Sequence, residues 1–247
     1  MLYILVRSMN PWKTKEAAIF WNKELSVYGK SAYVVGVLDL IRRQTPRVVF
    51  ELSIGNGQSF AGHLSKEGIQ VHGCDISHIL INELHQLYPE IGAYCSGYED
   101  FVYREGADTY DITYCVRSSW YFSDIYCALD NMLSITKPGG LVIIDIMNAD
   151  AHPIKKALRN IKKKRMKQRI KNVIKFFLNL IVKNRYKQEV IFWRDYPIRP
   201  DLFEAYIRKH GLVYEKFCFE QITGDGASLS QDSIRYLYKI KKSSLFV

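Results

Sequence analysis

The chain has 247 residues, of which 48% are hydrophobic and 24% are charged. This length suits one large domain or one domain with an insertion, and the composition excludes wholesale disorder. The five cysteines are scattered and form no C-x-x-C pair. We therefore expect no disulfide framework and no metal site, and the cysteine usage indicates a reduced, cytoplasmic protein.

The positive charge is concentrated in one segment. The net charge is +10, and residues 152–188 contain 14 Lys and Arg without a single acid. The rest of the chain carries 21 basic and 25 acidic side chains. The sequence thus predicts a mildly acidic domain with one strongly basic segment.

No stretch is long enough to cross a membrane as a helix. The longest apolar run, residues 173–182, is interrupted by Lys175 and Asn179, whereas a span needs about 20 residues. Residues 1–6 are apolar but too short for a signal-peptide core. They form an extra strand, or else translation starts at Met9, and the sequence leaves both alternatives open.

Strands and helices alternate through the first part of the chain. A helical pattern over residues 17–43 ends near Pro46. Apolar strands are then expected at 47–55, 69–76, 91–95, 111–116 and 141–147, separated by helices at 58–66, 77–87 and 125–136. Such alternation is typical of right-handed crossovers and a doubly wound parallel sheet.

The pattern changes after residue 147. A basic helical stretch covers 153–184, a helix follows at 199–210, and two strands at 212–221 and 234–240 are joined by a turn-rich link. These last strands should pair antiparallel. We expect an α/β fold with a mostly parallel seven-stranded sheet. Its parts are an N-terminal helical cap (1–46), a core (47–152 and 195–247) and a basic insertion (153–194).

The turn after the first strand indicates a nucleotide-like ligand. It reads Glu51-Leu-Ser53-Ile-Gly55-Asn-Gly57, and Asp75 ends the next strand. Glycines allow close backbone approach, and the following helix offers N–H groups to an anion. A carboxylate about twenty residues on is placed to bind ribose hydroxyls. Phe60 stands where a dinucleotide fingerprint needs its third glycine, which disfavours a dinucleotide.

The chain resembles the class I S-adenosylmethionine-dependent methyltransferases. The acid and glycines of the first turn, Asp75, the Tyr110-Asp111 start of the fourth strand and the Lys137-Pro-Gly-Gly140 turn match that family in order, as does the final strand pair. The resemblance implies S-adenosyl-L-methionine as cofactor. It also implies these cofactor-binding residues: Glu51, Ser53, Gly55, Gly57, Asp75, Ile76, Tyr98, Glu99 and Arg117.

Two departures from the family pattern affect the cofactor site. Ser53 replaces a glycine, at a modest expected cost because serine is small and its hydroxyl could bond the cofactor. After the third strand, the acid expected to meet the adenine amino group is ambiguous in register, so Tyr98, Glu99 and Asp100 all remain candidates.

Catalytic candidates follow the fourth and fifth strands. Arg117 opens the Arg117–Tyr121 loop, where the family places substrate groups; the alternative is a loop with a buried tryptophan. Asp150 and His152 follow the fifth strand at the same rim. A histidine there could act as a general base, because imidazole titrates near neutrality; the alternative is an inert surface residue.

The sequence narrows the methyl acceptor without identifying it. The loop after the fourth strand lacks the [DN]-P-P-[FYW] pattern of amino methylation of bases, and no Pro-Cys nucleophile occurs. We expect O- or N-methylation of a small-molecule or lipid- or sugar-linked acceptor. An RNA methyltransferase and a catalytically weak binding scaffold are the alternatives. The acceptor atom and the oligomeric state stay open.

The basic insertion has three interpretations. It forms a lid over the acceptor site, it docks on an anionic membrane surface through residues 153–187, or it binds nucleic acid, which is the least favoured. The apolar side chains near Phe177 suit a membrane surface.

Overall fold

The computed structural model describes residues 18–19, 22, 29–151, 196–224 and 233–243. The predicted basic insertion, His152 and most of the predicted N-terminal cap lie outside these residues. The described ranges include all seven strands expected for the core sheet.

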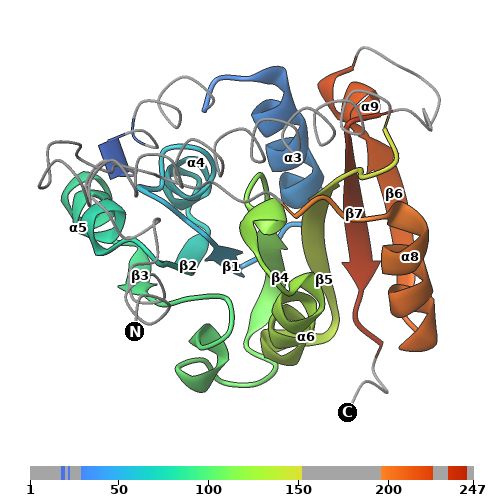
Figure 1. Cartoon of the computed structure of the whole chain (residues 1–247). Coiled ribbons are helices and arrows are strands. Elements are labelled where there is room, and N and C mark those ends of the chain that lie inside the picture. The colour runs from blue at the N-terminus through green and yellow to red at the C-terminus, as the bar shows by residue number, and fades with distance from the viewer. Residues whose placement is uncertain (1–17, 20–21, 23–28, 152–195, 225–232, 244–247) are drawn as a thin grey trace, which may run out of the picture.

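A single mixed sheet organises the fold (Figure 1). Its order is β3-β2-β1-β4-β5-β7-β6, and β7 runs in the opposite direction to the other six strands. The bounds are β1 Val48–Leu52, β2 Gln70–Asp75, β3 Gly92–Cys95, β4 Tyr110–Cys115, β5 Thr136–Met147, β6 Val213–Cys218 and β7 Arg235–Lys241. This confirms the predicted mostly parallel seven-stranded sheet.

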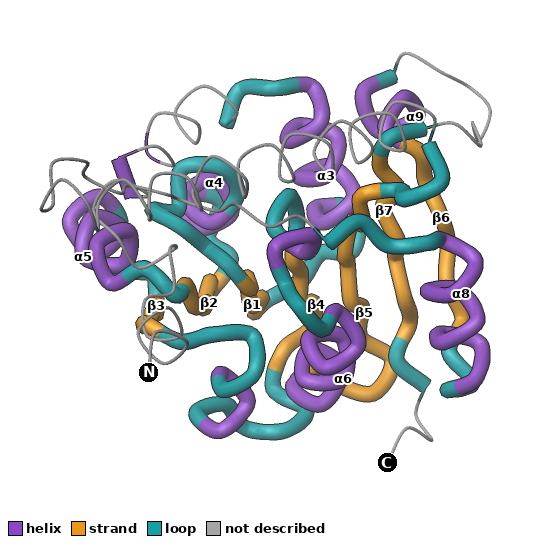
Figure 2. The backbone as a smooth tube through the Cα atoms, in the orientation of Figure 1, coloured by secondary structure: helices purple, strands orange, loops and turns teal. Residues whose placement is uncertain are grey.

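Helices cover both faces of the sheet (Figure 2). On one face lie α3 (Ala32–Arg42), α4 (Ala61–Lys66), α5 (His78–Leu87) and the short α9 (Phe219–Thr223). On the other lie α6 (Ile125–Ile135) and α8 (Pro200–Lys209). Each helix buries an apolar stripe at helical spacing, such as Val34, Val37 and Ile41 of α3. The result is a three-layer arrangement.

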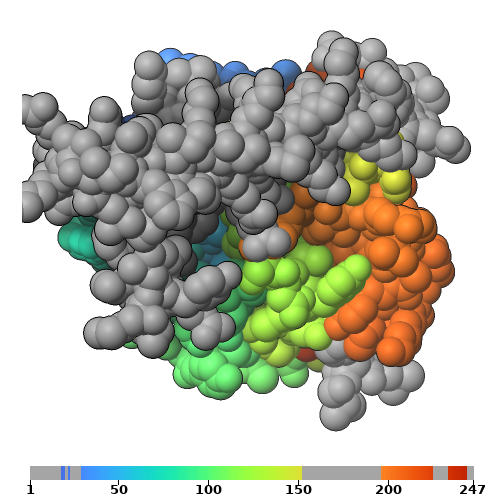
Figure 3. Space-filling view, viewed as in Figure 1, coloured from blue at the N-terminus to red at the C-terminus, as the bar shows by residue number. Residues whose placement is uncertain are grey.

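The second helical layer is closed by contacts between α6 and α8. The Tyr206 hydroxyl donates to the Asp130 carboxylate at 2.7 Å, and the rings of Tyr126 and Tyr206 are 4.5 Å apart. The surfaces of these two helices are adjacent in the space-filling view (Figure 3). This layer supports the sheet from the side away from α3 and α4.

Two predicted elements have different bounds in the structure. A continuous helix over 17–43 was expected, but α3 begins at Ala32, after a turn at Gly29 and Lys30, because the Ser31 side chain caps it. The strand expected over 212–221 ends at Cys218. There the backbone N–H of Cys218 donates to the Gln221 side chain at 3.0 Å, and α9 starts.

The fifth strand is longer than predicted. The Lys137-Pro-Gly-Gly140 segment was expected as a turn, but β5 runs from Thr136, with a register shift against β4 between Tyr110 and Ile112. Pro138 is tolerated because β-bulges interrupt the hydrogen-bond ladder. None of the helices in the described residues is both long and apolar enough to span a membrane.

Candidate functional site

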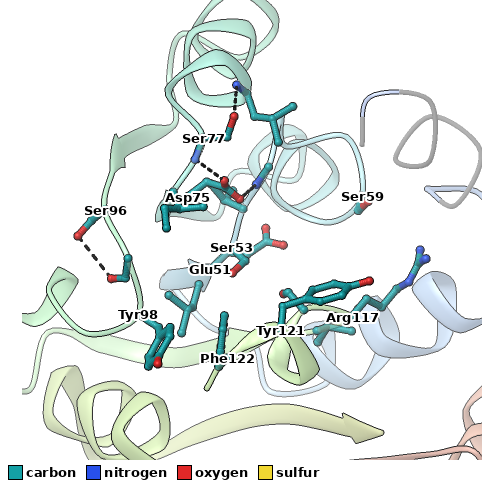
Figure 4. Close-up of a pocket in the computed structure, with 18 of the residues that line it drawn as sticks. Glu51, Ser53, Ser59, Asp75, Ser77, Ser96, Tyr98, Arg117, Tyr121 and Phe122 are labelled. Atoms are coloured by element: carbon teal, nitrogen blue, oxygen red, sulfur yellow. Dashed lines mark hydrogen bonds between the residues drawn. The ribbon is translucent and has the colours of Figure 1, made fainter. Parts of the chain in front are cut away.

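A pocket lies beyond the carboxyl ends of β1, β2 and β4 (Figure 4), where open parallel sheets bind ligands. We call one side the Tyr98 end, formed by Ile76, Gly97, Tyr98, Glu99 and Phe122. We call the other side the Arg117 end, formed by Ser59, Arg117 and Tyr121. Asp75 lies between the two ends in Figure 4.

The glycine-rich turn forms the floor between these ends. Ser53, Gly55 and Gly57 all adopt left-handed backbone angles, with φ of 66°, 60° and 78°. Ser53 and Gly55 line the pocket. Gly57 is not part of the pocket wall; a Cβ on it would lie 3.3 Å from Leu84 Cδ1 of α5. Gly57 is therefore a turn residue, and its lack of a side chain lets α5 approach.

Glu51 ties the floor to the rest of the sheet. Its side chain is almost fully buried, and its Oε2 accepts a hydrogen bond from the Tyr114 hydroxyl at 3.0 Å. Burial raises the pKa of Glu51 well above its usual range, while the bonds from Tyr114 and the backbone N–H of Ala61 act in the opposite direction. Glu51, which lines the pocket, thus also connects β1, β4 and the start of α4.

Asp75 presents a carboxylate at the middle of the pocket. Its Oδ2 accepts from the Gly55 backbone N–H at 3.1 Å, and its Oδ1 accepts from that of Ser77 at 2.8 Å. Burial raises the pKa of Asp75 to about 6, against these two backbone bonds. A carboxylate has about four acceptor positions, so each oxygen can still accept a hydrogen bond from a ligand hydroxyl.

Two aromatic rings form much of the Tyr98 end. The Tyr98 ring stacks on Phe122 with centroids 4.6 Å apart, and its hydroxyl is 2.7 Å from Ser123 Oγ. Ile76 and Glu99 complete the wall, whereas Asp100 does not line it. The structure therefore brings together the predicted residues Ile76, Tyr98 and Glu99 on one wall of the pocket, beside aromatic rings on which a planar ring could pack.

The Arg117 end is polar. Ser59 is 7% exposed, and its Oγ has no hydrogen-bond partner within the part of the chain that the structure describes. The backbone N–H of Arg117 donates to Asp145 Oδ1 at 2.8 Å. Figure 4 shows the side chains of Ser59, Arg117 and Tyr121 on the side of the pocket away from Ser96 and Tyr98.

The other two catalytic candidates are not part of this wall. Asp150 is half exposed, its Oδ2 lies 4.0 Å from Arg199 Nε, and its backbone N–H donates to Asn148 Oδ1 at 2.9 Å. His152 lies outside the described residues. No cluster of His, Cys, Asp and Glu that could hold a metal ion occurs in the described ranges.

Sequence reasoning missed three polar residues near the pocket. Ser59 and Ser77 gave no signal, because serine is common in turns. Asp145 did give one: it is a carboxylate inside the apolar run Leu141–Met147 and is fully buried. A charge in that position implies a specific partner.

The comparisons with known proteins agree with this geometry. Residues 50–144 match a family model described as a methyltransferase domain. A possible histamine N-methyltransferase from Thermotoga maritima is similar in structure, with a TM-score of 0.61 at 14% identity over 94% of this chain and 100% of that one. No curated protein matches the sequence.

Two further solved structures share the fold. One is the magnesium protoporphyrin IX methyltransferase of Synechocystis PCC 6803 with bound S-adenosylhomocysteine (SAH), with a TM-score of 0.57 at 14% identity, covering 91% of this chain and 88% of that one. The other is an S-adenosylmethionine-dependent methyltransferase from Clostridium acetobutylicum, with a TM-score of 0.60 at 12% identity, covering 91% and 99%.

The fold and the pocket define a class of enzyme, the Rossmann-like methyltransferases. Residues 50–144 match a methyltransferase domain, which agrees with the resemblance to class I S-adenosylmethionine-dependent methyltransferases seen in the sequence, and S-adenosylmethionine is the cofactor. The residues present suit that group: an aromatic wall for adenine at the Tyr98 end, a carboxylate with open acceptor positions for ribose at Asp75, and further along a Ser59 hydroxyl without a partner among the described residues.

Proposed function

We propose that this enzyme methylates an oxygen or nitrogen atom of a small-molecule acceptor, or of one linked to a lipid or sugar. The observation that carries the proposal is the Arg117 end. The pocket continues past Asp75 to Ser59, Arg117 and Tyr121, so it offers a polar recess beside the place where the methionine part of the cofactor would lie.

The chain itself contributes alignment rather than chemistry. The cofactor supplies an activated methyl group, and the enzyme gains rate chiefly by orienting the acceptor in line with it and excluding water. On this proposal Asp75 holds the ribose and the Tyr98–Phe122 pair borders the adenine. Residues at the Arg117 end then orient the acceptor.

The packing of the loop after β4 favours a small-molecule acceptor rather than a nucleic-acid base flipped out of its strand. Trp120 is 3% exposed, and the Arg235 guanidinium lies 4.6 Å from its ring centre. A ring packed in this way is not available for stacking on an extruded base, which base-flipping enzymes require. The names of two similar structures, a possible histamine N-methyltransferase and a magnesium protoporphyrin IX methyltransferase, both refer to small-molecule acceptors.

The lipid-linked form of the proposal depends on residues 153–187. Their 14 positive charges would attract an anionic surface, at about 1 kcal/mol per Lys or Arg near it. We propose that the same residues dock on an anionic membrane surface.

Transfer of labelled methyl groups tests the proposal. The protein and methyl-labelled S-adenosylmethionine are incubated with separate small-molecule, lipid and RNA fractions of a cell extract, with Asp75→Ala as the control that loses cofactor binding. We expect label in the small-molecule or lipid fraction. Label in RNA alone would favour the RNA alternative, and cofactor binding without transfer to any fraction would favour a binding scaffold.

A further inference from the structure

Two residues of the pocket wall have strained backbone. Among the described residues, four that are not glycine have positive φ: Thr45, Ser53, Asp108 and Arg117. Ser53 and Arg117 line the pocket. A left-handed L-residue costs free energy and persists only where its surroundings hold it there. Ser53 belongs to the glycine-rich turn, but Arg117, with φ of 69°, needs a separate explanation.

Asp145 of β5 provides that explanation. It is fully buried, and its Oδ1 accepts the backbone N–H of Arg117 at 2.8 Å. Its Oδ2 accepts the hydroxyl of Tyr33, from α3, at 3.0 Å. The two oxygens of one buried carboxylate therefore connect the start of the loop after β4 to α3, which packs on one face of the sheet.

Arg235 of β7 compensates the buried charge. Burial raises the pKa of Asp145, and the charge of Arg235 opposes that rise more than the charge of Arg117 does. The Arg235 guanidinium lies over the rings of Trp120 and Tyr33, 4.6 and 5.9 Å from their centres, and Tyr33 stacks on Phe219 at 5.1 Å. Tyr33, Arg117 and Arg235 thus act on the Asp145 carboxylate directly, and Trp120 and Phe219 pack against Arg235 and Tyr33.

The held residue forms part of a site with hydrogen-bond donors. Arg117 shares its end of the pocket with the Tyr121 ring and with Ser59, whose buried Oγ has no partner in the described ranges. A guanidinium is a planar fork of donors that matches the two oxygens of a carboxylate. The chemistry of this end therefore fits a carboxylate.

We propose that Asp145 and Tyr33 are positioning residues that hold Arg117 in its left-handed conformation, and that Arg117 so held recognises a carboxylate at its end of the pocket. The carboxylate has two sources: the α-carboxylate of the methionine part of the cofactor, or a carboxylate of the methyl acceptor. If the carboxylate belongs to the methyl acceptor, this inference rests on the proposed function; if it belongs to the cofactor, it does not.

Binding of two adenosine compounds tests whether the carboxylate belongs to the cofactor. SAH and 5′-methylthioadenosine share the adenosine and the thioether, but only the former has the amino-carboxyl group. If the carboxylate is the cofactor's, wild type binds SAH at least tenfold more tightly. Arg117→Met then removes most of that ratio and leaves methylthioadenosine affinity within twofold, which also shows that the variant is folded. Asp145→Asn and Tyr33→Phe reduce the ratio in the same direction by less.

Tyr114→Phe is the matched control. It removes a buried tyrosine-to-carboxylate bond of the same 3.0 Å length, from Tyr114 to Glu51, but not one that holds Arg117. It should change the affinities for both nucleosides by the same factor. Arg117→Lys, which keeps the charge but not the fork, should restore only part of the ratio.

The kinetics of methyl transfer test whether the carboxylate belongs to the methyl acceptor. Labelled methyl transfer is followed with extract components that an anion-exchange column retains. If the carboxylate is the acceptor's, Arg117→Met leaves the nucleoside ratio intact but raises the half-saturating amount of this fraction at least tenfold. Transfer to components that the column does not retain should be unaffected. If Arg117→Met changes neither the ratio nor the half-saturating amount, or weakens both nucleosides equally, the proposal is wrong.

Discussion

Asp75 and the Arg117 end of the pocket are held in place differently. The Asp75 carboxylate accepts hydrogen bonds from two backbone N–H groups, that of Ser77 in its own turn and that of Gly55 in the adjacent glycine-rich turn. At the Arg117 end, the conformation of Arg117 depends on Asp145, and Asp145 is held by Tyr33 from a distant helix. Backbone groups of two turns thus position Asp75, whereas buried side chains from distant elements position Arg117.

This difference teaches which part of the site can vary without loss of the cofactor. A turn held by its own backbone keeps its shape when distant residues change, since changes at well-separated sites usually act independently. A residue held through a chain of side chains moves when any member of the chain changes. We therefore expect changes around Asp145 to alter selectivity, and changes around Asp75 to abolish cofactor binding.

The largest effect is expected from Asp75→Ala. It removes a carboxylate that can accept two ribose hydroxyl bonds, each worth about 1.5–3 kcal/mol, so affinity for SAH should fall by about 100-fold or more by calorimetry. Asp111→Ala is the matched control. Asp111 also accepts backbone N–H bonds, from Arg47 and Val48, but does not line the pocket. A similar loss of affinity in both variants would show that the effect is not specific to the ribose site.

Gly36→Ala tests the tertiary support of the Arg117 end. A Cβ at Gly36 would lie 2.1 Å from the backbone oxygen of Ile222 in α9, so α3 and α9 must separate. We expect a loss of about 1–3 kcal/mol in the free energy of unfolding, measured with urea. Val35→Ala, on the exposed side of the same helix, should cost little. Equal losses in the two variants would contradict the close packing of α3 on α9.

The pH dependence of cofactor binding tests the Asp75 carboxylate. Because the pKa of Asp75 in the free protein is raised by burial to about 6, most of this group is protonated at pH 5. Affinity for SAH should then be roughly tenfold lower at pH 5 than at pH 7.

The same titration acts on stability in the opposite direction. The folded pKa of Asp75 lies above its ordinary value of 3.8, so the folded state takes up the proton first. The contribution of Asp75 to the free energy of unfolding therefore increases as pH falls from about 6 towards 4.

The control for the binding measurement is Asp75→Ala, which should bind SAH weakly at pH 5 and at pH 7. A wild-type affinity that does not change with pH would contradict the assignment.

The smallest effect is expected from Ser53→Gly. An L-residue in the left-handed conformation destabilises the folded state by about 1–2 kcal/mol, and glycine avoids this cost. Part of the gain is lost because glycine makes the unfolded chain more flexible. The variant should be more stable by about 1 kcal/mol in urea unfolding. Thr45→Gly, at a positive φ outside the cofactor pocket, should give a similar gain. A gain at Thr45 but none at Ser53 would mean that the Ser53 side chain makes a compensating contact.

Sequence alone predicted the locally determined features. The alternation of strands and helices, the glycine-rich turn and the acid at the end of β2 all follow from short-range patterns, and the structure has them in the expected order. It could also have indicated Asp145, since a carboxylate within an apolar strand requires a partner. It could not say that the partners are Tyr33 and Arg117, 112 and 28 residues away.

The errors in element bounds have the same physical origin. Helical spacing continues through Gly29 and Lys30, so only the cap formed by Ser31 shows where α3 begins. The strand predicted beyond Cys218 is instead the short helix α9, because the Gln221 side chain bonds back to the Cys218 backbone. Both boundaries depend on single side-chain bonds that hydrophobic periodicity does not encode.

A crystal structure of the protein with SAH tests the central claim most directly. We predict that both ribose hydroxyls lie within hydrogen-bond distance of the Asp75 carboxylate, with the adenine against Tyr98 and Phe122 and the homocysteine directed towards Arg117. A ligand bound in the reverse direction, with its adenine beside Arg117 and no contact to Asp75, would contradict this prediction.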